Sequence, residues 1–489
     1  MPLRRSLETS SVFRNLDWIT VVLYLLMVVA GMVSIYAASY DFDEASMFSA
    51  DEFSGKQLRW IGLSVVLAMI ILLVDWRMYE TYAYPIYVAI LVLLFITPFI
   101  AHDIKGSRSW ISLGSMSLQP AEFAKFAAAL ALAKLFSGYQ FSLNAKASNY
   151  LRALLIIFLP VALILAQNET GSALTFLALF LVLYREGMSG LVLFGAFFSV
   201  AIFVVGLKFA DDSIIGMPLG EFIVMIMVMV AVVGMTCIYC RRLEVCRNIF
   251  LIYFLGGLAV WALVSFGVPV PALASGLGLI GLGCVYLVFE SLRHHLNRLL
   301  VPVATALLSL AFLFSVNAAF SHLQPHQRLR VEVALGMIED LRDAGYNVNQ
   351  SKIAIGSGGL YGKGFLNGTQ TKLKYVPEQH TDFIFCTIGE EEGFMGSLAV
   401  TALFMAMILR VLAIGERQPT TFGRVYAYCV ASYLMFHFII NIGMVIGLCP
   451  VIGIPLPFFS YGGSSLWGFT ILLFVLLKID ASRKSVLSY

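Results

Sequence analysis

Charged residues are scarce in this chain of 489 residues: Asp, Glu, Lys and Arg together make up 12% of it, whereas soluble domains carry roughly a quarter. The net charge is only +3, and the basic residues are spread over many short loops. That distribution excludes the concentrated positive field of a nucleic-acid-binding protein. Because 60% of the residues are hydrophobic, the composition indicates a polytopic membrane protein.

Cysteine is also rare. Of the seven cysteines, four lie in or beside apolar runs, namely Cys237, Cys284, Cys386 and Cys429. Only Cys449 is expected on the outer side of the membrane, so a disulfide framework is not expected. Cys237 and Cys240 form a Cys-x-x-Cys motif, but no second pair completes a structural zinc site.

The chain has instead a long series of apolar runs, each near the ~20 residues that cross a bilayer as a helix. The first run, from Trp18 to Ala38, is long and has no clear cleavage site, so it is expected to be a retained helix and not a signal peptide. We predict an all-α fold in a single membrane domain, 1–489, with about fourteen transmembrane helices. Their ranges are 18–39, 57–75, 83–101, 120–136, 151–167, 170–184, 189–208, 219–239, 248–267, 271–290, 298–320, 382–411, 424–447 and 464–478.

The positive-inside rule predicts the orientation. With the N-terminus in the cytoplasm, most loop arginines and lysines fall on the inner side, and an even number of helices returns the C-terminus to the same side. The loops that then face outward are 41–52, 102–119, 321–380 and 447–464. The polar chemistry of the chain therefore converges on the outer face.

The loop 321–380 is the largest polar segment of the chain. Asp340 lies in it close in sequence to Arg328 and Arg330, where a carboxylate can accept a proton from a substrate hydroxyl; a solvated loop acid is the alternative. The glycine-dense run 356–364 lacks the spacing of a nucleotide-binding P-loop. Its amides, together with Lys363, could form an anion-binding nest, or the run could be a flexible turn.

Ionisable residues also occur at the start of predicted membrane helices. Glu122 and Lys125, three positions apart, share one helix face, and charges inside a membrane helix usually mark a polar interior or a pathway. A purely structural ion pair is the alternative. Glu169 precedes the short segment 170–184 in a similar position. His437, alone on an apolar helix, is expected to be a satisfied core histidine.

Six motifs occur in a fixed order along the chain. They are Arg108-Ser109-Trp110 with Gln119-Pro120-Ala121-Glu122-Phe123-Ala124-Lys125; Gly345-Tyr346 through Leu360; Gly368-Thr369-Gln370; Pro377 through Phe385, which includes Glu378, His380 and Asp382; Gly389-Glu390-Glu391; and Gly453 through Gly463. Together they resemble the SEDS family (shape, elongation, division and sporulation). The runs 355–359 and 368–370 are similar to its elongation branch.

This resemblance implies a peptidoglycan glycosyltransferase that polymerises lipid II during cell elongation at the outer, periplasmic face of the bacterial inner membrane. The family's catalytic aspartate stands six residues before the tyrosine of its Gly-Tyr pair, a position that Asp340 occupies before Tyr346. A class B penicillin-binding protein is the implied partner. A divalent cation, Mg²⁺ or Mn²⁺, is a candidate cofactor. Since the family has ten helices, about four helices in 209–297 look inserted.

Residues for substrate binding follow from the same motifs and loops. The candidates are Arg108, Glu122, Lys125, Glu169, Arg328, Arg330, Lys363, Glu378, His380 and Asp382. A flippase for the lipid-linked precursor is an alternative function, although it needs access from both sides of the membrane and these polar residues gather on one. The division-specific role within the same family, and a non-catalytic scaffold, also remain open at this stage.

Overall fold

The computed structural model describes residues 13–40, 52–101, 103, 107–113, 116–214, 216–268, 270–322, 328, 331–332, 335, 337 and 345–483. It forms two compact units, one made of 1–189 with 341–489 and the other of 190–340. Within the described residues, twelve helices are long and apolar enough to cross a membrane. Helices are the expected spanning elements because they satisfy every backbone polar group internally where no water is present.

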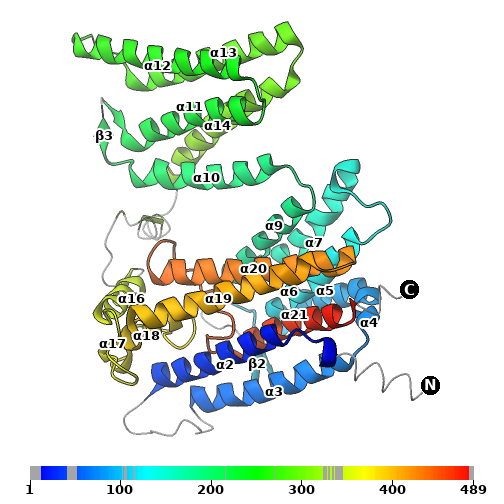
Figure 1. Ribbon diagram of the computed structural model, residues 1–489. Helices are drawn as coiled ribbons and strands as arrows, with labels where there is room; N and C mark the ends of the chain where they lie inside the picture. The colour runs from blue at the N-terminus through cyan, green and yellow to red at the C-terminus, as the bar shows by residue number, and fades with distance from the viewer. Residues whose placement is uncertain are drawn as a thin grey trace. The chain divides into compact units, whose positions relative to one another are not determined.

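The first unit comprises 1–189 and 341–489, and its helices are labelled in Figure 1. Its elements are α2 (Trp18–Ser39), α3 (Phe53–Leu73), α4 (Trp76–Thr81), α5 (Ala83–Ile100), β1 (Ile111–Leu113), β2 (Met116–Leu118), α6 (Pro120–Phe136), η1 (Leu143–Ala145), α7 (Ala147–Leu165), α8 (Thr170–Thr175), η2 (Phe176–Ala178), α9 (Leu179–Arg185), α16 (Tyr346–Ser357), α17 (Thr369–Lys372), α18 (Ile384–Glu391), α19 (Gly393–Glu416), α20 (Thr421–Val445) and α21 (Gly463–Ala481).

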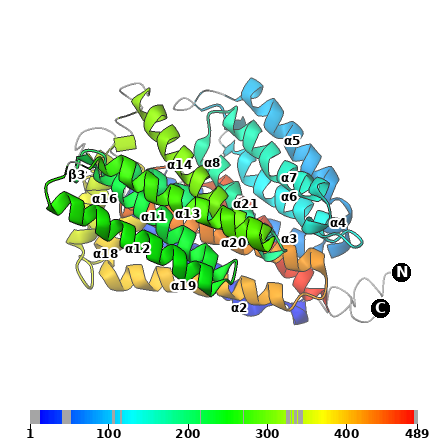
Figure 2. The same cartoon turned by 90° about the horizontal axis from the view of Figure 1, so that it is seen from above.

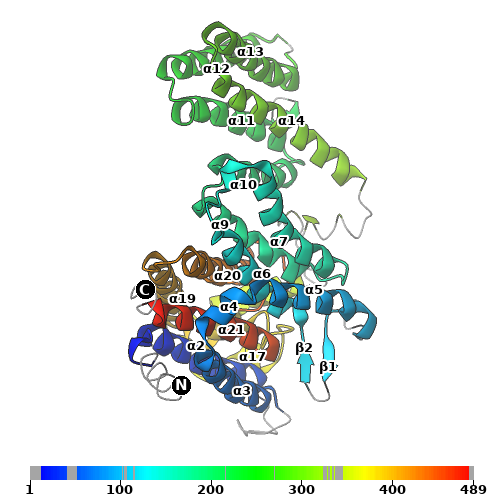
Figure 3. The same ribbon diagram turned by 90° about the vertical axis from the view of Figure 1, so that its right-hand side faces the viewer.

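The core of this unit is built on α6, which packs against α5, α20 and α21. Seven alanines of α6 are buried, and such small side chains let neighbouring helices approach closely. The short strands β1 and β2 pair antiparallel, with Ile111 opposite Leu118, and form the hairpin labelled in Figure 3. Strand β2 contacts α21. This hairpin leads directly into Pro120, which is the first residue of α6. It therefore fixes where the polar start of α6 lies.

The second unit is a smaller helical body. Its elements are α10 (Gly190–Lys208), β3 (Ser213–Ile214), β4 (Met217–Pro218), α11 (Leu219–Ile238), α12 (Leu243–Ser265), α13 (Ala272–His294), η3 (Asn297–Leu299) and α14 (Leu300–Ser321). Helices α12 and α13 run side by side (Figure 2). The core is apolar and includes Val224, Ile249 and Leu287. The unit extends beyond the predicted insertion 209–297 at both ends, and its status as an insertion stays a prediction.

Each of the fourteen predicted spans has a helical counterpart, but two predictions of helix continuity are wrong. The segment 382–411 is broken between Glu391 and Gly393, because the φ of +65° at Gly393 is not helical. A Cβ there would lie 2.2 Å from the backbone nitrogen of Gly362, so only glycine fits. The segment 170–184 is divided among α8, η2 and α9. Two predicted spans, 170–184 and 120–136, are not among the twelve long apolar helices. The second of them corresponds to α6, which has 17 residues.

The contact of Gly31 in α2 with the loop before α21 leads to a stability prediction. A Cβ on Gly31 would lie 2.4 Å from the carbonyl oxygen of Phe458 and 2.7 Å from Cα of Phe459, and backbone cannot move aside cheaply. Gly31→Ala should therefore lower the free energy of unfolding by about 1–3 kcal/mol. Gly62→Ala in α3 is the matched control, since nothing lies within 4 Å of its Cβ position; it should be neutral or stabilising. Denaturant unfolding of both variants in detergent measures the difference, and equal stability would contradict the close contact.

Candidate functional site

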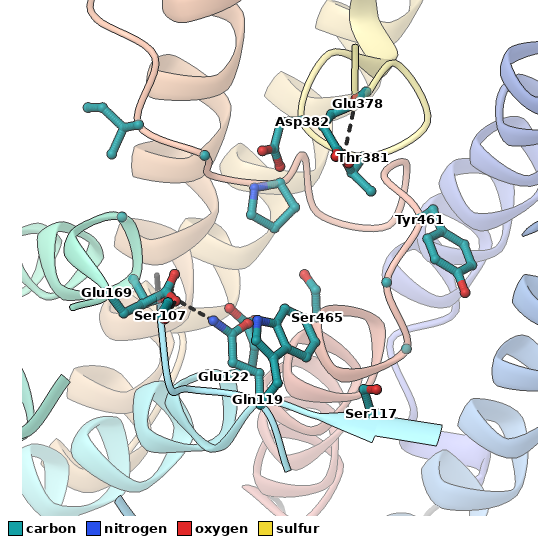
Figure 4. Close-up of a pocket in the computed structure, with 18 of the residues that line it drawn as sticks. Ser107, Ser117, Gln119, Glu122, Glu169, Glu378, Thr381, Asp382, Tyr461 and Ser465 are labelled. Carbon is teal, nitrogen blue, oxygen red and sulfur yellow. Dashed lines mark hydrogen bonds between the residues drawn. The ribbon is translucent and has the colours of Figure 1, made fainter. Parts of the chain in front are cut away.

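A polar cavity of about 650 Å³ opens in the first unit. Figure 4 shows the side chains around it. Its walls come from the start of α3, the β1–β2 hairpin, the starts of α6 and α8, the turn before α18 and the irregular loop before α21. The lining residues are Lys56, Arg59, Trp60, Ser107, Trp110, Ser117, Gln119, Glu122, Asn168, Glu169, Thr170, Gly171, Ser172, Glu378, Thr381, Asp382, Ile452, Gly453, Pro455, Tyr461, Gly462, Gly463 and Ser465. Segments far apart in the sequence thus share one cavity.

Glu122 lies at the cavity wall and Lys125 is buried behind it. The Nζ atom of Lys125 lies 2.9 Å from Oε1 and 2.8 Å from Oε2 of Glu122, although only the contact to Oε1 has hydrogen-bond geometry. The two side chains, Lys125 and Glu122, are 1% and 3% exposed. Each charge of a buried ion pair is stable only while its partner is present, because an unpaired buried charge is strongly destabilising. The pair therefore fixes a carboxylate at the edge of the cavity.

His437 of α20 is the second partner of Lys125, whose Nζ lies 3.0 Å from Nε2 of the histidine. An ammonium group can only donate, so Nε2 must accept, and Nδ1 then carries the hydrogen and donates to the carbonyl oxygen of Pro455 at 3.0 Å. The interpretation of His437 as a satisfied core histidine agrees with these two contacts. The histidine also links the buried lysine to the cavity, because Pro455 is one of the lining residues.

Glu169 is held by hydroxyl groups. Its Oε2 accepts hydrogen bonds from Ser107 at 3.1 Å and Ser109 at 2.7 Å, and its Oε1 accepts one from Ser172 at 3.3 Å. These donors come from the segment before β1 and from α8, so the carboxylate ties two walls of the cavity together. Arg108, between the two serines, is exposed and lies 3.8 Å from Asp103; it is not among the lining residues.

The turn before α18 brings two more acidic side chains to the cavity, those of Glu378 and Asp382. Glu378 has a positive φ of 54°, and the Thr381 hydroxyl donates to its Oε2 at 3.2 Å. Asn441 of α20 donates to the backbone carbonyls of Asp382 and Ile454, each at 2.8 Å. One buried amide thereby positions both the turn and the loop before α21.

Two basic residues line the same cavity, and sequence reasoning missed both of them. Lys56 and Arg59 stand three positions apart on α3 and therefore share one helix face. Arg59 lies in the first turn of the predicted span 57–75 and Lys56 immediately precedes that span, whereas both lie inside the observed α3. Charge at the start of a membrane helix was the signal that could have found them.

His380 is not among the residues that line the cavity. Its ring stacks on Phe53 with centroids 4.1 Å apart, and Phe53 meets Tyr461 edge-on at 5.0 Å. The backbone carbonyl of His380 accepts a hydrogen bond from the amide of Tyr461 at 2.9 Å. This contact joins the turn 378–382 to the loop before α21.

Lys363 and the glycine run 356–364 lie away from the cavity, against α18. The amides of Lys363 and Gly364 donate to the carbonyls of Glu390 and Glu391 at 3.0 and 2.9 Å, so these amides cannot form the predicted anion-binding nest. The Lys363 ammonium pairs with the buried carboxylate of Glu390 at 2.7 Å. A Cβ on Gly362 would lie 2.0 Å from the carbonyl oxygen of Glu391. Glycine at 362 thus permits close backbone packing against α18.

Three predicted site residues remain, namely Arg328, Arg330 and Asp340. Arg328 belongs to the second unit and pairs with Glu332 at 2.7 Å. Arg330 and Asp340 lie outside the described residues. Within the described ranges no three His, Cys, Asp or Glu side chains gather in a way that could hold a metal ion, and the divalent cation stays a prediction.

Glu390 and Glu391 have opposite environments at the end of α18. Burial alone would raise the pKa of Glu390, but hydrogen bonds from Lys363, Thr371 and two backbone amides outweigh it and lower the pKa. Burial raises the pKa of Glu391 to about 7, which backbone hydrogen bonds only partly offset. Its Oε1 is buried without a hydrogen-bond partner. Glu391 therefore takes up a proton near neutral pH.

The raised pKa of Glu391 gives the fold a pH dependence. A carboxyl group whose pKa is higher in the folded chain stabilises the fold while it is protonated, so this contribution is full below about pH 4.5 and is lost as the pH rises to about 7. The loss is at most about 3 kcal/mol. Unfolding curves from pH 5 to 8 should show this decline in the unaltered protein, and Glu391→Gln should flatten it. An equal slope in the variant would contradict this assignment.

Fold and site together define a class: a polytopic α-helical membrane protein with an open polar cavity lined by four carboxylates and two cations. The family model FTSW_RODA_SPOVE, described as cell cycle protein, matches residues 17–215 and 221–485. The chain belongs to the FtsW/RodA/SpoVE family and is a multi-pass bacterial membrane protein.

Curated relatives are similar over nearly the whole chain. Peptidoglycan glycosyltransferase RodA of Treponema pallidum is 29% identical, with 96% of this chain and 98% of that protein covered. Peptidoglycan glycosyltransferase MrdB of Escherichia coli K12 is also 29% identical, with 88% of this chain and 86% of that protein covered. The family and the enzyme names of these relatives agree with the resemblance found in the sequence.

Solved structures share the fold. One, described as "Structural coordination of polymerization and crosslinking by a peptidoglycan synthase complex", gives a TM-score of 0.61 at 24% identity, with 96% of this chain and 98% of that chain covered. The rod shape determining protein RodA of Thermus thermophilus gives a TM-score of 0.51 at 22% identity, with 96% of this chain and 97% of that chain covered.

Proposed function

We propose that this protein is a peptidoglycan glycosyltransferase that polymerises lipid II during cell elongation, with release of undecaprenyl pyrophosphate. The observation that carries the proposal is the cavity itself, where four acidic residues and two cations line one space in a chain of the FtsW/RodA/SpoVE family. The curated relatives bear the corresponding enzyme name. Carboxylates can accept hydrogen bonds from sugar hydroxyls and cations can pair with a diphosphate, so a cavity with both suits such a substrate.

In the proposed reaction Asp340 accepts the proton of the 4-hydroxyl of the acceptor's N-acetylglucosamine as that oxygen attacks C1 of the donor's N-acetylmuramic acid. The bond from C1 to the diphosphate breaks, and the diphosphate leaves as an anion. Because this leaving group is already a weak base, it needs neutralisation of its charge more than a general acid, so one catalytic carboxylate is enough where glycosidases use two. Asp340 is assigned from the motif spacing.

Lys56 and Arg59 are the proposed partners of the diphosphate, because both line the cavity. They take the place of Lys125 and Lys363, neither of which is among the residues that line the cavity. Cations fixed where negative charge develops stabilise a transition state more than mobile water does. The other candidates for binding the diphosphate are Arg108, Arg328 and Arg330.

The proposed ligands of the sugar hydroxyls are Glu169, Glu378 and Asp382. These three acidic residues line the cavity.

The proposed location is the bacterial inner membrane, with both termini in the cytoplasm and the cavity facing the periplasm. The distribution of loop lysines and arginines supports this orientation. A class B penicillin-binding protein is the proposed partner, which would crosslink the new strands. The similar synthase complex is described as coordinating polymerisation with crosslinking, and this supports the partnership.

The test is polymer formation from purified lipid II by the purified chain, alone and together with a class B penicillin-binding protein. Glycan strands resolved on a gel, with undecaprenyl pyrophosphate released, are the expected result. The opposite result would be a preparation that moves labelled lipid II between the leaflets of a vesicle but makes no polymer, either alone or with the penicillin-binding protein. That result would show a flippase and not an enzyme.

A further inference from the structure

A second polar cavity, of about 200 Å³, lies in the first unit where α2 begins and α21 ends. It is independent of the proposed catalytic cavity, because α21 starts at the first and ends at the second. The helix has 19 residues and so spans about 28 Å. The lining residues of the second cavity are Arg14, Asn15, Leu16, Asp17, Arg417, Asp480, Ala481 and Arg483.

Two buried carboxylates form the base of this cavity. The side chain of Asp480 is 0% exposed and that of Asp17 is 5% exposed. Arg417 bridges them, with Nε 2.9 Å from Asp480 and Nη2 3.1 Å from Asp17. Burial by itself raises the pKa of Asp17, but hydrogen bonds from Arg410, Thr20 and Arg417 lower it further than burial raises it. Asp17 is therefore negatively charged at neutral pH.

In the described part of the chain, four arginines surround these two carboxylates. Arg410 pairs with Asp17 through Nε at 3.0 Å, and Arg483 pairs with Asp480 through Nη1 at 2.6 Å. Arg14 is exposed at the rim. We call these four arginines, Arg14, Arg410, Arg417 and Arg483, the arginine cluster.

The contacts with Asp17 and Asp480 use only part of the guanidinium N–H groups of the arginine cluster. The side chains of Arg410, Arg417 and Arg483 are 27–30% exposed, and a guanidinium has five N–H donors, of which the two carboxylates occupy only some. The carboxylates are too deeply buried to take part in outside contacts, whereas the arginines are not. Among the described residues, the cavity therefore has more arginines than carboxylates, and its guanidinium groups are partly exposed at the opening.

We propose that the arginine cluster binds the phosphodiester headgroup of an anionic phospholipid. Guanidinium groups match phosphate oxygens in a bidentate manner, and the cluster lies at the ends of spanning helices, where headgroups lie. Trp18 and Ile19, at the start of α2, are 54% and 56% exposed and offer apolar contact to the adjoining acyl chains. In the proposed topology this end faces the cytoplasmic leaflet, which is rich in anionic lipid.

The test compares lipid retention by the full-length chain in detergent after exposure to mixed vesicles of phosphatidylcholine and phosphatidylglycerol. The variants are Arg14→Gln and Arg483→Gln, which leave Asp480 paired with Arg417. Each should reduce the phosphatidylglycerol retained, measured by native mass spectrometry, by about fivefold. Arg483→Lys keeps the charge but loses the planar guanidinium, so it should lose part of the binding while its thermal stability stays close to that of the unaltered protein; full retention would contradict bidentate recognition.

Arg185→Gln is the matched control. Arg185 is 55% exposed and pairs with Glu416, at the same end of α19, at 3.1 Å, but it does not line the cavity. Its replacement should leave retention unchanged. Equal losses in Arg185→Gln and Arg483→Gln would overturn the proposal, since nonspecific surface charge would then explain the binding. Thermal unfolding of each variant shows that it is folded.

A soluble competitor distinguishes the lipid from a free phosphate. Glycerol phosphate carries the phosphate group without acyl chains, and it should not displace phosphatidylglycerol at the concentration where vesicles saturate the site. Displacement at equal concentration would overturn the lipid assignment, because the cluster would then recognise the phosphate alone. Neither experiment depends on glycan synthesis, so the lipid site and the proposed function can fail separately.

Discussion

Replacing Asp340 by asparagine should lower glycan polymerisation by the purified protein about 10²-fold or more, because a positioned general base contributes about 10²–10⁴-fold to a rate. Asparagine has nearly the same shape as aspartate but cannot accept a proton from the attacking hydroxyl. Lipid II binding should therefore persist while turnover is lost. The measurement is the rate of strand formation at saturating lipid II, with binding followed separately.

The neighbours of Asp340 provide controls matched in charge and position. Glu339 and Asp343 lie one and three residues away in the same polar segment, and Glu339→Gln and Asp343→Asn should keep most of the activity. If either control loses as much activity as Asp340→Asn, the base would have to be reassigned. Near-normal strand synthesis by Asp340→Asn would remove Asp340 from the mechanism while leaving the function of the protein intact.

Replacing Lys125 by methionine should destabilise the fold by about 3–5 kcal/mol, because it leaves the buried carboxylate of Glu122 without its cation. Lys125 is 1% exposed, and its ammonium also contacts His437. Adding Glu122→Gln to the same chain removes the unpaired charge and should recover much of the loss. Denaturant unfolding in detergent of both single variants and the double variant measures the coupling.

Lys134 is the control for this experiment, since it is the second lysine that α6 pairs with a carboxylate. Its ammonium lies 3.2 Å from Glu80, but the side chains are 34% and 29% exposed. An exposed pair is worth about 0–1 kcal/mol, so Lys134→Met should have a small effect. If Lys125→Met and Lys134→Met lowered the free energy of unfolding equally, burial of the Glu122–Lys125 pair would not explain the loss of stability in Lys125→Met.

The sequence predicted the membrane-spanning elements well because hydropathy is a local property. Whether a run such as 421–445 spans a bilayer depends on its own length and composition. The predicted orientation of the loops follows from charges close to each run. The motifs likewise identified the family, since order and spacing are written directly in the chain. Helix continuity could not be predicted in the same way: Gly393 begins α19 with a φ of +65°, and a Cβ there would have no room beside Gly362.

The tertiary structure decided which charged residues share a cavity. Lys363 looked like an anion ligand in sequence, but packing of the glycine run against α18 pairs it with Glu390. Lys56 and Arg59 belong to none of the motifs and line the cavity only because α3 packs against α21. Lys125 and His437, 312 residues apart, meet because α6 packs on α20. Local composition determined that the chain crosses a membrane, whereas the electrostatic partners of each charge depended on which distant helices touch.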